Sequence, residues 1–347
     1  MATAHTVEGW ISPGADRIGP TPAPPPTRRG AGERPVSAAI ETTGLTKAYG
    51  RSRGVEDVDL EVRAGEIFGF LGPNGAGKTT VIRLLLDLIR PTRGHARILG
   101  LDAHRDAVAV HRQIGYVAGN PALYDRLTGR RCCTWLAGLR GDPDPAGIDA
   151  LAERLEVDLD RPIRDLSSGN RQKVALVQAL AHRPAVLLLD EPTAWLDPMA
   201  QEVFAELVRE ATAGGATVFL SSHRLDEVQH LCDRVGIIAE GRMVAVERVD
   251  DLRHRAWRSI TLEFTDAVDP APFAALRGVA DVTATGRVLR LRAEGDLDPL
   301  VKLAAAHHVV DLVSEPPDLE EIFRSYFPAD GRNGGPVAGP GTGDRAD

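Results

Sequence analysis

The stretch that decides the fold is residues 72–79, which read Gly72-Pro73-Asn74-Gly75-Ala76-Gly77-Lys78-Thr79. It matches the phosphate-binding pattern GxxxxGK[ST], follows the apolar run Ile67–Leu71, and opens a helical pattern over Thr79–Arg90. Glycines let the backbone curve round a phosphate with its N–H groups pointing inward, and a helix N-terminus adds partial positive charge. The stretch therefore predicts a phosphate-binding loop between a strand and a helix, and not merely a glycine-rich turn.

Within this loop, the Lys78 ammonium is expected to reach the β- and γ-phosphates, and the Thr79 hydroxyl is expected to bind Mg²⁺. Lysine is rare in this chain, since only four of its 41 basic residues are lysines, so a lysine at this position stands out. The predicted nucleotide-binding residues here are Gly72, Pro73, Asn74, Gly75, Ala76, Gly77, Lys78, Thr79 and Thr80.

A second stretch that carries candidate catalytic groups is Val186–Glu191, an apolar strand that ends in two carboxylates. Ligands of open α/β sheets bind at the carboxyl ends of the strands. Asp190 is expected to hold Mg²⁺ directly or through water, and Glu191 to orient or deprotonate an attacking water. The structural alternative is ordinary strand-end charge combined with helix capping.

Apolar strands alternate with helical patterns along much of the chain. The predicted strands are 39–42, 55–62, 67–71, 186–189, 217–220 and 235–239, and helices are predicted at 79–90, 171–181 and 201–211. Residues 119–165 are more helical and polar. Buried strands that alternate with helices indicate an α/β fold with a largely parallel sheet.

Composition narrows the function classes. The 347 residues carry a net charge of −8, which argues against a protein that binds nucleic acid through a broad basic surface. No run approaches the roughly 18–20 apolar residues that span a bilayer, and no secretory signal is expected. The three cysteines, Cys132, Cys133 and Cys232, favour neither a disulfide framework nor a zinc site.

Further motifs resemble those of ATP-binding cassette (ABC) ATPases, over roughly residues 39–247. Leu166–Gln172 resembles the LSGGQ signature, and Asp190–Pro198 resembles the Walker B motif followed by the D-loop. Ser221-Ser222-His223 resembles the switch histidine segment, and Tyr49 the aromatic residue that stacks on adenine. The resemblance implies a P-loop ATPase with a RecA-like core, an antiparallel β-subdomain and a helical signature subdomain, which hydrolyses ATP with Mg²⁺.

In this family two cassettes pack head to tail, so the signature of one closes over the ATP of the other. The resemblance thus implies that Ser167, Ser168, Gly169 and Asn170 act on a partner's ATP, and that Asp197 contacts the partner. His223 would reach the γ-phosphate and align Glu191. The structural alternatives are a helix cap for Ser167 and for Asp197, a structural role for His223, and a rim position for Tyr49.

The chain departs from the family pattern at two sites. Gly119 stands where the Q-loop glutamine is expected after the strand 114–117, and glycine offers no side-chain oxygen to a metal or water. Whether Asn120 or a water replaces that oxygen is left open. In the signature, Ser168 and Asn170 replace glycine and glutamine, whereas Ser167 and Gly169 are kept, so a functional signature is expected.

The predicted domains are a Pro-rich disordered tail (1–36), the ABC ATPase domain (37–250), a small α+β accessory domain (251–327) and a Gly/Pro-rich disordered tail (328–347). In the accessory domain, strands are expected at 260–264 and 288–291, with helices at 272–276, 297–305 and 319–326. The last helix resembles the end of bacterial drug- and antibiotic-efflux cassettes. It is expected to pack on its own domain or on a dimer partner.

The resemblance also implies partners. We expect a homodimer or heterodimer of cassettes that lies on the cytoplasmic face of the membrane, bound to a separate transmembrane permease and to no nucleic acid. Residues 124–131 are the predicted permease contact, and solvated surface is the alternative. An exporter is favoured over an importer ATPase or a soluble ABC protein acting on ribosomes or DNA. No NKxD pattern follows the phosphate loop, which excludes a GTPase.

Overall fold

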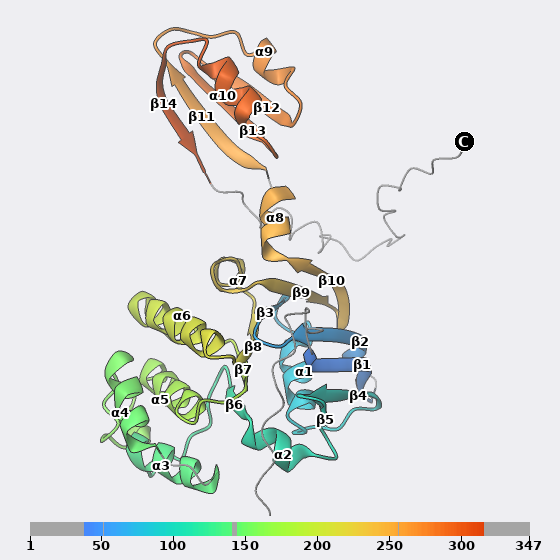
Figure 1. Cartoon of the computed structure of the whole chain (residues 1–347), viewed down its shortest axis with the longest axis vertical. Coiled ribbons are helices and arrows are strands. Elements are labelled where there is room, and N and C mark those ends of the chain that lie inside the picture. The colour runs from blue at the N-terminus through green and yellow to red at the C-terminus, as the bar shows by residue number, and fades with distance from the viewer. Residues whose placement is uncertain (1–37, 51, 141–143, 256, 316–347) are drawn as a thin grey trace, which may run out of the picture. The chain divides into compact units, whose positions relative to one another are not determined.

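The computed structural model describes residues 38–50, 52–140, 144–255 and 257–315. Its central sheet has six strands in the order β10-β9-β3-β8-β7-β6 (Figure 1). All neighbours are parallel except the edge pair β10–β9. The strands are β3 (Ile67–Leu71), β6 (Ile114–Val117), β7 (Val186–Asp190), β8 (Thr217–Ser222), β9 (Arg234–Ala239) and β10 (Arg242–Arg248).

The inner strands are apolar throughout because both faces of the sheet are covered. Alternate residues of β7 belong to different hydrophobic clusters, since Val186 and Leu188 pack on one face while Leu187 and Leu189 pack on the other. Every residue of β3, β7 and β8 is buried. This burial on two sides explains why the sequence shows continuous apolar runs here and not a polar–apolar alternation.

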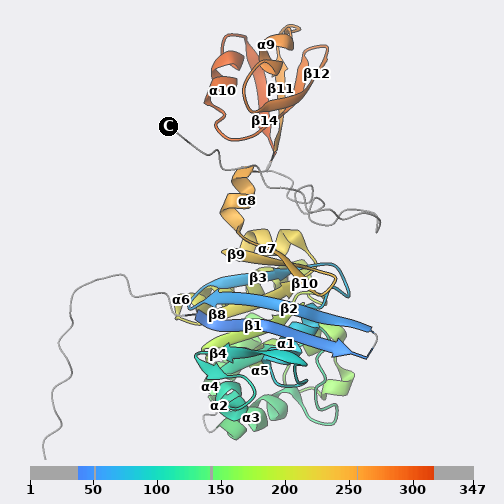
Figure 2. The same ribbon diagram turned by 90° about the vertical axis from the view of Figure 1, so that its right-hand side faces the viewer.

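One face of the central sheet shares its core with a second, antiparallel sheet in the order β2-β1-β4-β5. Its strands are β1 (Ala38–Tyr49), β2 (Ser52–Arg63), β4 (Arg93–Ile98) and β5 (Leu101–Asp102). Figure 2 shows β1, β2 and β4 side by side. Helix α1 (Lys78–Leu85) contributes its apolar residues to the same cluster, which therefore joins both sheets through this helix. The short helix α2 (Ala107–Arg112) leads into β6.

Helices cover the other face of the central sheet. They are α3 (Gly129–Arg140), α4 (Pro145–Arg154), the 3₁₀ turn η1 (Ile163–Asp165), α5 (Ser168–Leu180), α6 (Pro198–Ala213), α7 (Leu225–Leu231) and α8 (Val249–Arg255). Buried residues of α3 to α7 form one cluster with β3, β7, β8 and β9. The α/β architecture with its parallel core, antiparallel sheet and helical region confirms the predicted fold class.

A third sheet, entirely antiparallel, lies in the C-terminal part in the order β12-β13-β11-β14. Its strands are β11 (Arg258–Phe264), β12 (Val279–Thr285), β13 (Val288–Ala293) and β14 (Val309–Ser314), accompanied by α9 (Ala271–Ala274) and α10 (Asp298–Ala304). These elements form a hydrophobic cluster of their own around Phe264 and Phe273. The content is α+β, as predicted, whereas the predicted domain boundaries stay predictions.

Several element predictions need correction. Helix α1 ends at Leu85, five residues earlier than predicted, because Asp87 adopts a left-handed backbone (φ 52°) and its carboxylate bonds His104 Nδ1 at 3.0 Å. The strands β4, β5, β10, β12 and β14 were not predicted. The predicted helix at 319–326 and both predicted tails lie outside the described residues.

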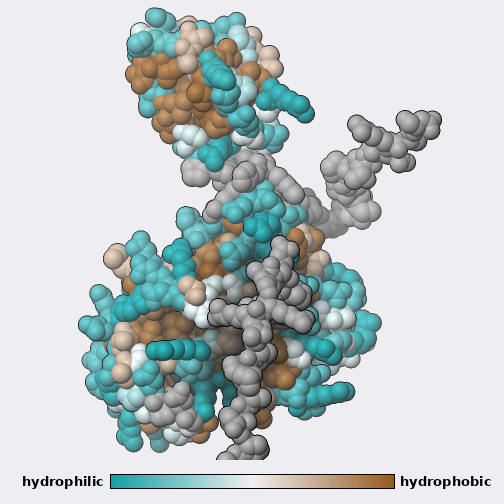
Figure 3. All heavy atoms as spheres, viewed as in Figure 1, coloured by the Kyte–Doolittle hydropathy of each residue, from teal (hydrophilic) through white to brown (hydrophobic). Residues whose placement is uncertain are grey.

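Strand register explains how distant segments meet. Leu71 of β3 is paired with Ser222 of β8, and Asp190 of β7 is paired with Ser221. The loops that follow these three strands therefore leave the sheet at one edge. Among the described residues, no helix is both long and apolar enough to cross a membrane. On the face shown in Figure 3, hydrophilic side chains surround smaller hydrophobic areas.

Candidate active site

The loop after β3 has a backbone that favours glycine. Gly75 (φ 82°) and Gly77 (φ 111°) are left-handed, and a Cβ on Gly72 would lie 2.3 Å from the carbonyl oxygen of Ile238. Gly77 is the N-cap of α1, and no side chain caps this helix. Its first N–H groups are therefore not bound by a capping side chain, which suits them to an anion such as a phosphate.

Lys78 is the first residue of α1, directly after the loop, and is 5% exposed. Its Nζ donates to the carbonyl oxygens of Gly72 at 2.7 Å and Pro73 at 3.2 Å. The same Nζ lies 3.4 Å from Oε1 of Glu191. A buried ammonium needs such partners, and a phosphate could replace them, because it offers stronger acceptors.

Glu191 comes to this ammonium from the end of β7. Its N–H donates to the Ser221 carbonyl at 3.0 Å, and also lies 3.2 Å from Ser221 Oγ. Its Oε1 lies 3.3 Å from Nδ1 of His223, which follows β8. Three residues predicted from three separate motifs, Lys78, Glu191 and His223, are thus brought together. Both Glu191 and His223 remain partly exposed, so water has access.

The predicted metal ligands are a hydroxyl and a carboxylate. Asp190 is buried, and its Oδ1 accepts a 2.5 Å hydrogen bond from Ser221 Oγ. Thr79 is half-buried in the first turn of α1. Hydroxyl and carboxylate oxygens fit Mg²⁺, which in nucleotide sites takes one or two protein ligands and fills its shell with phosphate and water. Within the described ranges, no cluster of three or more His, Cys, Asp or Glu forms an all-protein metal site.

Tyr49 lies at the end of β1 and is 43% exposed. The Nζ of Lys47 lies 5.5 Å from the centre of its ring. The neighbouring residues Lys47 and Ala48 line a cavity of about 440 Å³, together with Gly54 and Arg242. An exposed aromatic ring beside a cavity is suited to stacking on a flat base. The adenine role of Tyr49 stays a prediction.

The signature and D-loop residues serve as helix caps. Ser167 Oγ caps α5 by accepting from the Asn170 N–H at 3.3 Å, and Asp197 Oδ1 caps α6 by accepting from Ala200 at 2.9 Å. This backbone hydrogen bond lowers the pKa of Asp197. A Cβ on Gly169 would lie 2.7 Å from the Trp195 carbonyl, so the signature packs tightly on the D-loop. In the described structure, none of these hydrogen bonds reaches Lys78, Glu191 or His223.

The structure adds residues that sequence reasoning missed. The Trp195 indole donates to the carbonyl of Gly119 at 2.9 Å, which joins the D-loop to the position that lacks the expected glutamine. Gln172 Nε2 donates to the Pro192 carbonyl at 2.9 Å, and Glu227 accepts hydrogen bonds from Thr193 and Ser222. Gln172 was visible as part of the signature stretch, whereas Glu227 had no sequence signal.

Comparisons with known proteins agree with this geometry. A family model described as ABC transporter matches residues 55–194. The bacitracin transport ATP-binding protein BcrA of Bacillus licheniformis is 37% identical over 234 residues, which cover 67% of this chain and 76% of BcrA. The linearmycin resistance ATP-binding protein LnrL of Bacillus subtilis (strain 168) is 31% identical over 300 residues, 82% of this chain and 96% of LnrL. A solved structure described as an ATP-binding subunit of an ABC transporter has a TM-score of 0.58 and 31% identity, and covers 62% of this chain and 92% of its own.

Proposed function

This chain belongs to the ABC transporter family of ATP-binding proteins and is an ATPase, and from that premise we propose that it powers a separately encoded permease that exports an antibiotic or a similar compound. The observation that supports the hydrolysis step is that Oε1 of Glu191 contacts both Lys78 Nζ, at 3.4 Å, and His223 Nδ1, at 3.3 Å. The export direction is supported by relatives named for bacitracin transport and linearmycin resistance.

The three converging side chains take distinct roles toward ATP. Lys78 moves from the loop carbonyls to the β- and γ-phosphate oxygens, where its charge stabilises the charge that develops in the transition state. Glu191 accepts a proton from water as the water oxygen attacks the γ-phosphorus. The bond to the ADP oxygen then breaks, releasing ADP and phosphate. His223 orients the Glu191 carboxylate and contacts the γ-phosphate.

The loop residues and two oxygen ligands complete the nucleotide site. Backbone N–H groups of residues 72–77 and of the first turn of α1 hold the phosphates, and Tyr49 stacks on the adenine. Thr79 and Asp190 hold Mg²⁺, which when bound neutralises charge on the phosphate oxygens.

A second cassette completes each site in this proposal. Ser167, Ser168, Gly169 and Asn170 at the N-terminus of α5 face the ATP bound by the partner, and Asp197 contacts the partner. Their caps present a helix N-terminus with partial positive charge, which suits a γ-phosphate. The active form is therefore a head-to-tail dimer that binds two ATP, formed with a second copy or a related chain.

The permease contact is proposed at residues 124–131. Tyr124 and Trp135 are about half exposed and pack edge to face, with ring centres 5.2 Å apart. They line a cavity of about 520 Å³ together with Leu127 and Arg131. Exposed aromatic pairs are enriched at protein interfaces, and docking here would hold the chain on the cytoplasmic face of the membrane.

The hydrolysis part is tested by Lys78→Ala, measured as phosphate release from ATP by the purified chain. Turnover should fall by about 10²-fold or more, because the transition state loses its main cation. Lys302→Ala is the matched control, since Lys302 is exposed and, among the described residues, pairs with Asp298 one turn away. A Lys78→Ala variant as active as the wild type would refute the assignment of the phosphate loop.

The transport part is tested on solubilised membranes that contain the affinity-tagged chain. We expect a multi-span membrane protein to copurify, and the combined substitution of Tyr124 and Trp135 by alanine to abolish its recovery. The control is the combined substitution of the exposed residues Val108 and Met199 by alanine, which should leave the recovery unchanged. Failure to recover any multi-span protein with the wild-type chain would contradict the proposed transport function.

A further inference from the structure

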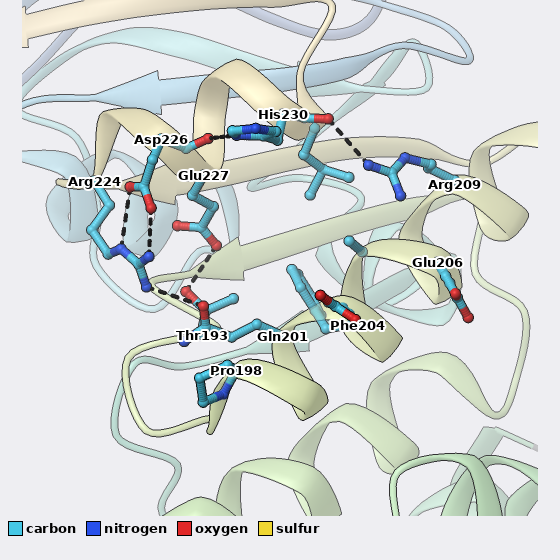
Figure 4. Close-up of a pocket in the computed structure, with 13 residues that line it drawn as sticks. Thr193, Pro198, Gln201, Phe204, Glu206, Arg209, Arg224, Asp226, Glu227 and His230 are labelled. Carbon is cyan, nitrogen blue, oxygen red and sulfur yellow. Dashed lines mark hydrogen bonds and ion pairs between the residues drawn. The ribbon is translucent and has the colours of Figure 1, made fainter. Parts of the chain in front are cut away.

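Two buried hydroxyl groups beside the active site donate to one carboxylate. Thr193 Oγ1 donates to Oε1 of Glu227 at 2.9 Å, and Ser222 Oγ donates to Oε2 at 2.6 Å. Figure 4 shows the Glu227 side chain extending from α7 to Thr193 on the loop that follows β7. One oxygen of the carboxylate is thus held by Thr193 in the loop after β7, and the other by Ser222, the last residue of β8.

The loop after β7 and the segment at the end of β8 carry the proposed catalytic side chains. Thr193 follows Glu191 by two positions, and Ser222 directly precedes His223. Thr193 is 5% exposed and Ser222 is 2% exposed, so water does not readily replace either hydrogen bond. The carboxylate therefore adds a side-chain link between two chain segments that the backbone also joins, through the Glu191 N–H bond to the Ser221 carbonyl.

Neighbouring contacts restrain the same network. Ser222 Oγ accepts from the N–H of Arg224 at 2.9 Å, and the Arg224 guanidinium bonds Asp226 and Gln201, as Figure 4 shows. Burial raises the pKa of the Glu227 carboxyl, while the hydrogen bonds from Ser222 and Thr193 act in the opposite direction by stabilising its charged form. The two hydroxyls thus offset part of the cost of keeping a charge here.

We propose that Glu227 is a positioning residue for ATP hydrolysis, which holds the Glu191 carboxylate and the His223 imidazole at their 3.3 Å contact through Thr193 and Ser222. The inference rests on the catalytic roles proposed above for Glu191 and His223. Among the described residues, Glu227 bonds neither Lys78 nor residues 72–77. The link from Ser222 to the phosphate loop is a backbone bond, from the Gly72 N–H to the Ser222 carbonyl at 3.4 Å, which loss of the Glu227 side chain does not remove. Loss of Glu227 is therefore expected to reduce kcat and to leave ATP binding intact.

The test measures kcat, KM and the ATP dissociation constant of the full chain with Thr193→Val, Thr193→Ser and Glu227→Ala. Thr193→Val keeps the shape but loses the hydroxyl, and should reduce kcat by about tenfold, since small misplacements of reacting groups are costly. Thr193→Ser keeps the hydroxyl and should retain kcat. Glu227→Ala should reduce kcat at least as much, with the ATP dissociation constant within about twofold of wild type.

Matched controls separate positioning from general loss of stability. Thr212→Val removes a hydroxyl whose described hydrogen bond goes to the Val208 carbonyl within α6. Glu206→Ala removes an exposed carboxylate that lines the pocket shown in Figure 4, which Glu227 also lines. Both should keep kcat. The double variant Thr193→Val with Glu227→Ala should be no slower than Glu227→Ala, because Thr193 acts through the carboxylate.

Three outcomes would overturn the inference: wild-type kcat in Thr193→Val, multiplicative losses in the double variant, or a weakened ATP affinity that accounts for the loss. If Glu227→Ala does not fold, Thr193→Val and Ser222→Ala decide the question alone. Glu191→Gln distinguishes the two proposals. If it is inactive while Glu227→Ala and Thr193→Val are fully active, the positioning role fails but the proposed catalysis stands.

Discussion

At the scale of single residues, Glu191 combines a functional group with a strained backbone. Its φ of 46° lies in the left-handed region, which costs a non-glycine residue about 1 kcal/mol. The hydrogen bonds of its N–H to Ser221 offset that cost. The left-handed residue thus stands where the chain leaves β7, and its carboxylate contacts both Lys78 and His223.

The same residues show what sequence reasoning reaches and where it stops. Lys78 was predicted from the phosphate-loop pattern, Glu191 from the acidic end of an apolar strand, and His223 from the resemblance to the ABC switch segment. The bond from Trp195 to the Gly119 carbonyl was not, because it joins positions 76 residues apart through a backbone group that every residue has. A hydrogen bond to a backbone carbonyl does not depend on the type of the accepting residue, so the sequence does not predict it.

His182 gives a pH prediction at this scale. Its Nε2 lies 3.2 Å from the Ile114 carbonyl, while its buried Nδ1 has no hydrogen-bond partner among the described residues. Burial, and then the nearby charge of Arg140, lower the pKa of His182 below its usual 6.5. The folded chain consequently binds fewer protons than the unfolded chain below pH 6.5. The stability that His182 contributes is therefore present above that pH and lost as the pH falls through its folded pKa.

We expect the free energy of unfolding of wild type to decrease relative to that of His182→Gln as the pH falls from 7 to 5. Glutamine keeps a donor for the Ile114 carbonyl but does not titrate. Urea denaturation at each pH measures the difference, and taking the difference cancels other titrating groups such as Glu227. Parallel curves for the two proteins would show that His182 titrates alike in the folded and unfolded chain.

At the scale of elements, the N-terminus of α6 separates a structural from a functional role for Asp197. The carboxylate caps the helix and lies 3.8 Å from the Lys173 ammonium. Asparagine also caps helices well, whereas alanine does not. The two substitutions thus differ mainly in the cap, while both remove the charge.

We expect Asp197→Ala to lower the melting temperature and Asp197→Asn to leave it nearly unchanged, because only alanine removes the cap. If Asp197 contacts a partner cassette, as proposed, both variants should reduce ATP turnover. Thermal denaturation and phosphate release measured on the same samples separate these effects. Full turnover in Asp197→Asn would leave the cap as the whole role of Asp197.

Element by element, the prediction succeeded for continuous apolar runs and for alternating strands such as β11 and β13, and failed where few strand residues are buried. The strands β3, β7 and β8 are continuous apolar runs and were predicted within a residue or two. Strand β4 buries only Ala96 and Ile98, and every residue of β14 after the first is exposed, so neither shows a clear pattern. The early end of α1 depends on the left-handed backbone of Asp87, which the residue pattern of this helix does not predict.

At the scale of the whole molecule, the register of β3, β7 and β8 explains why motifs more than 140 residues apart form one site. Leu71 of β3 is paired with the end of β8, which is paired with the end of β7, and Glu191 and His223 directly follow these two strand ends. The alternation of strands and helices predicted this convergence. The resemblance to ABC cassettes, and not this alternation, implied that the signature residues act away from Lys78 of their own chain, and none of their described hydrogen bonds reaches Lys78. That separation is what a site shared between two cassettes requires.

The last prediction follows from that separation. Glu191→Gln removes the proposed base but keeps an amide of the same shape, so ATP should bind while turnover falls by about 10²-fold or more. Without hydrolysis, ATP held between the phosphate loop of one chain and α5 of the other should keep the dimer closed. We expect sedimentation to show a dimer of Glu191→Gln with ATP and a monomer with ADP, whereas Glu206→Gln, altered at an exposed carboxylate, should behave as wild type. A variant that binds ATP but stays monomeric would exclude a homodimer, and the partner would then have to be a different cassette that supplies its own signature.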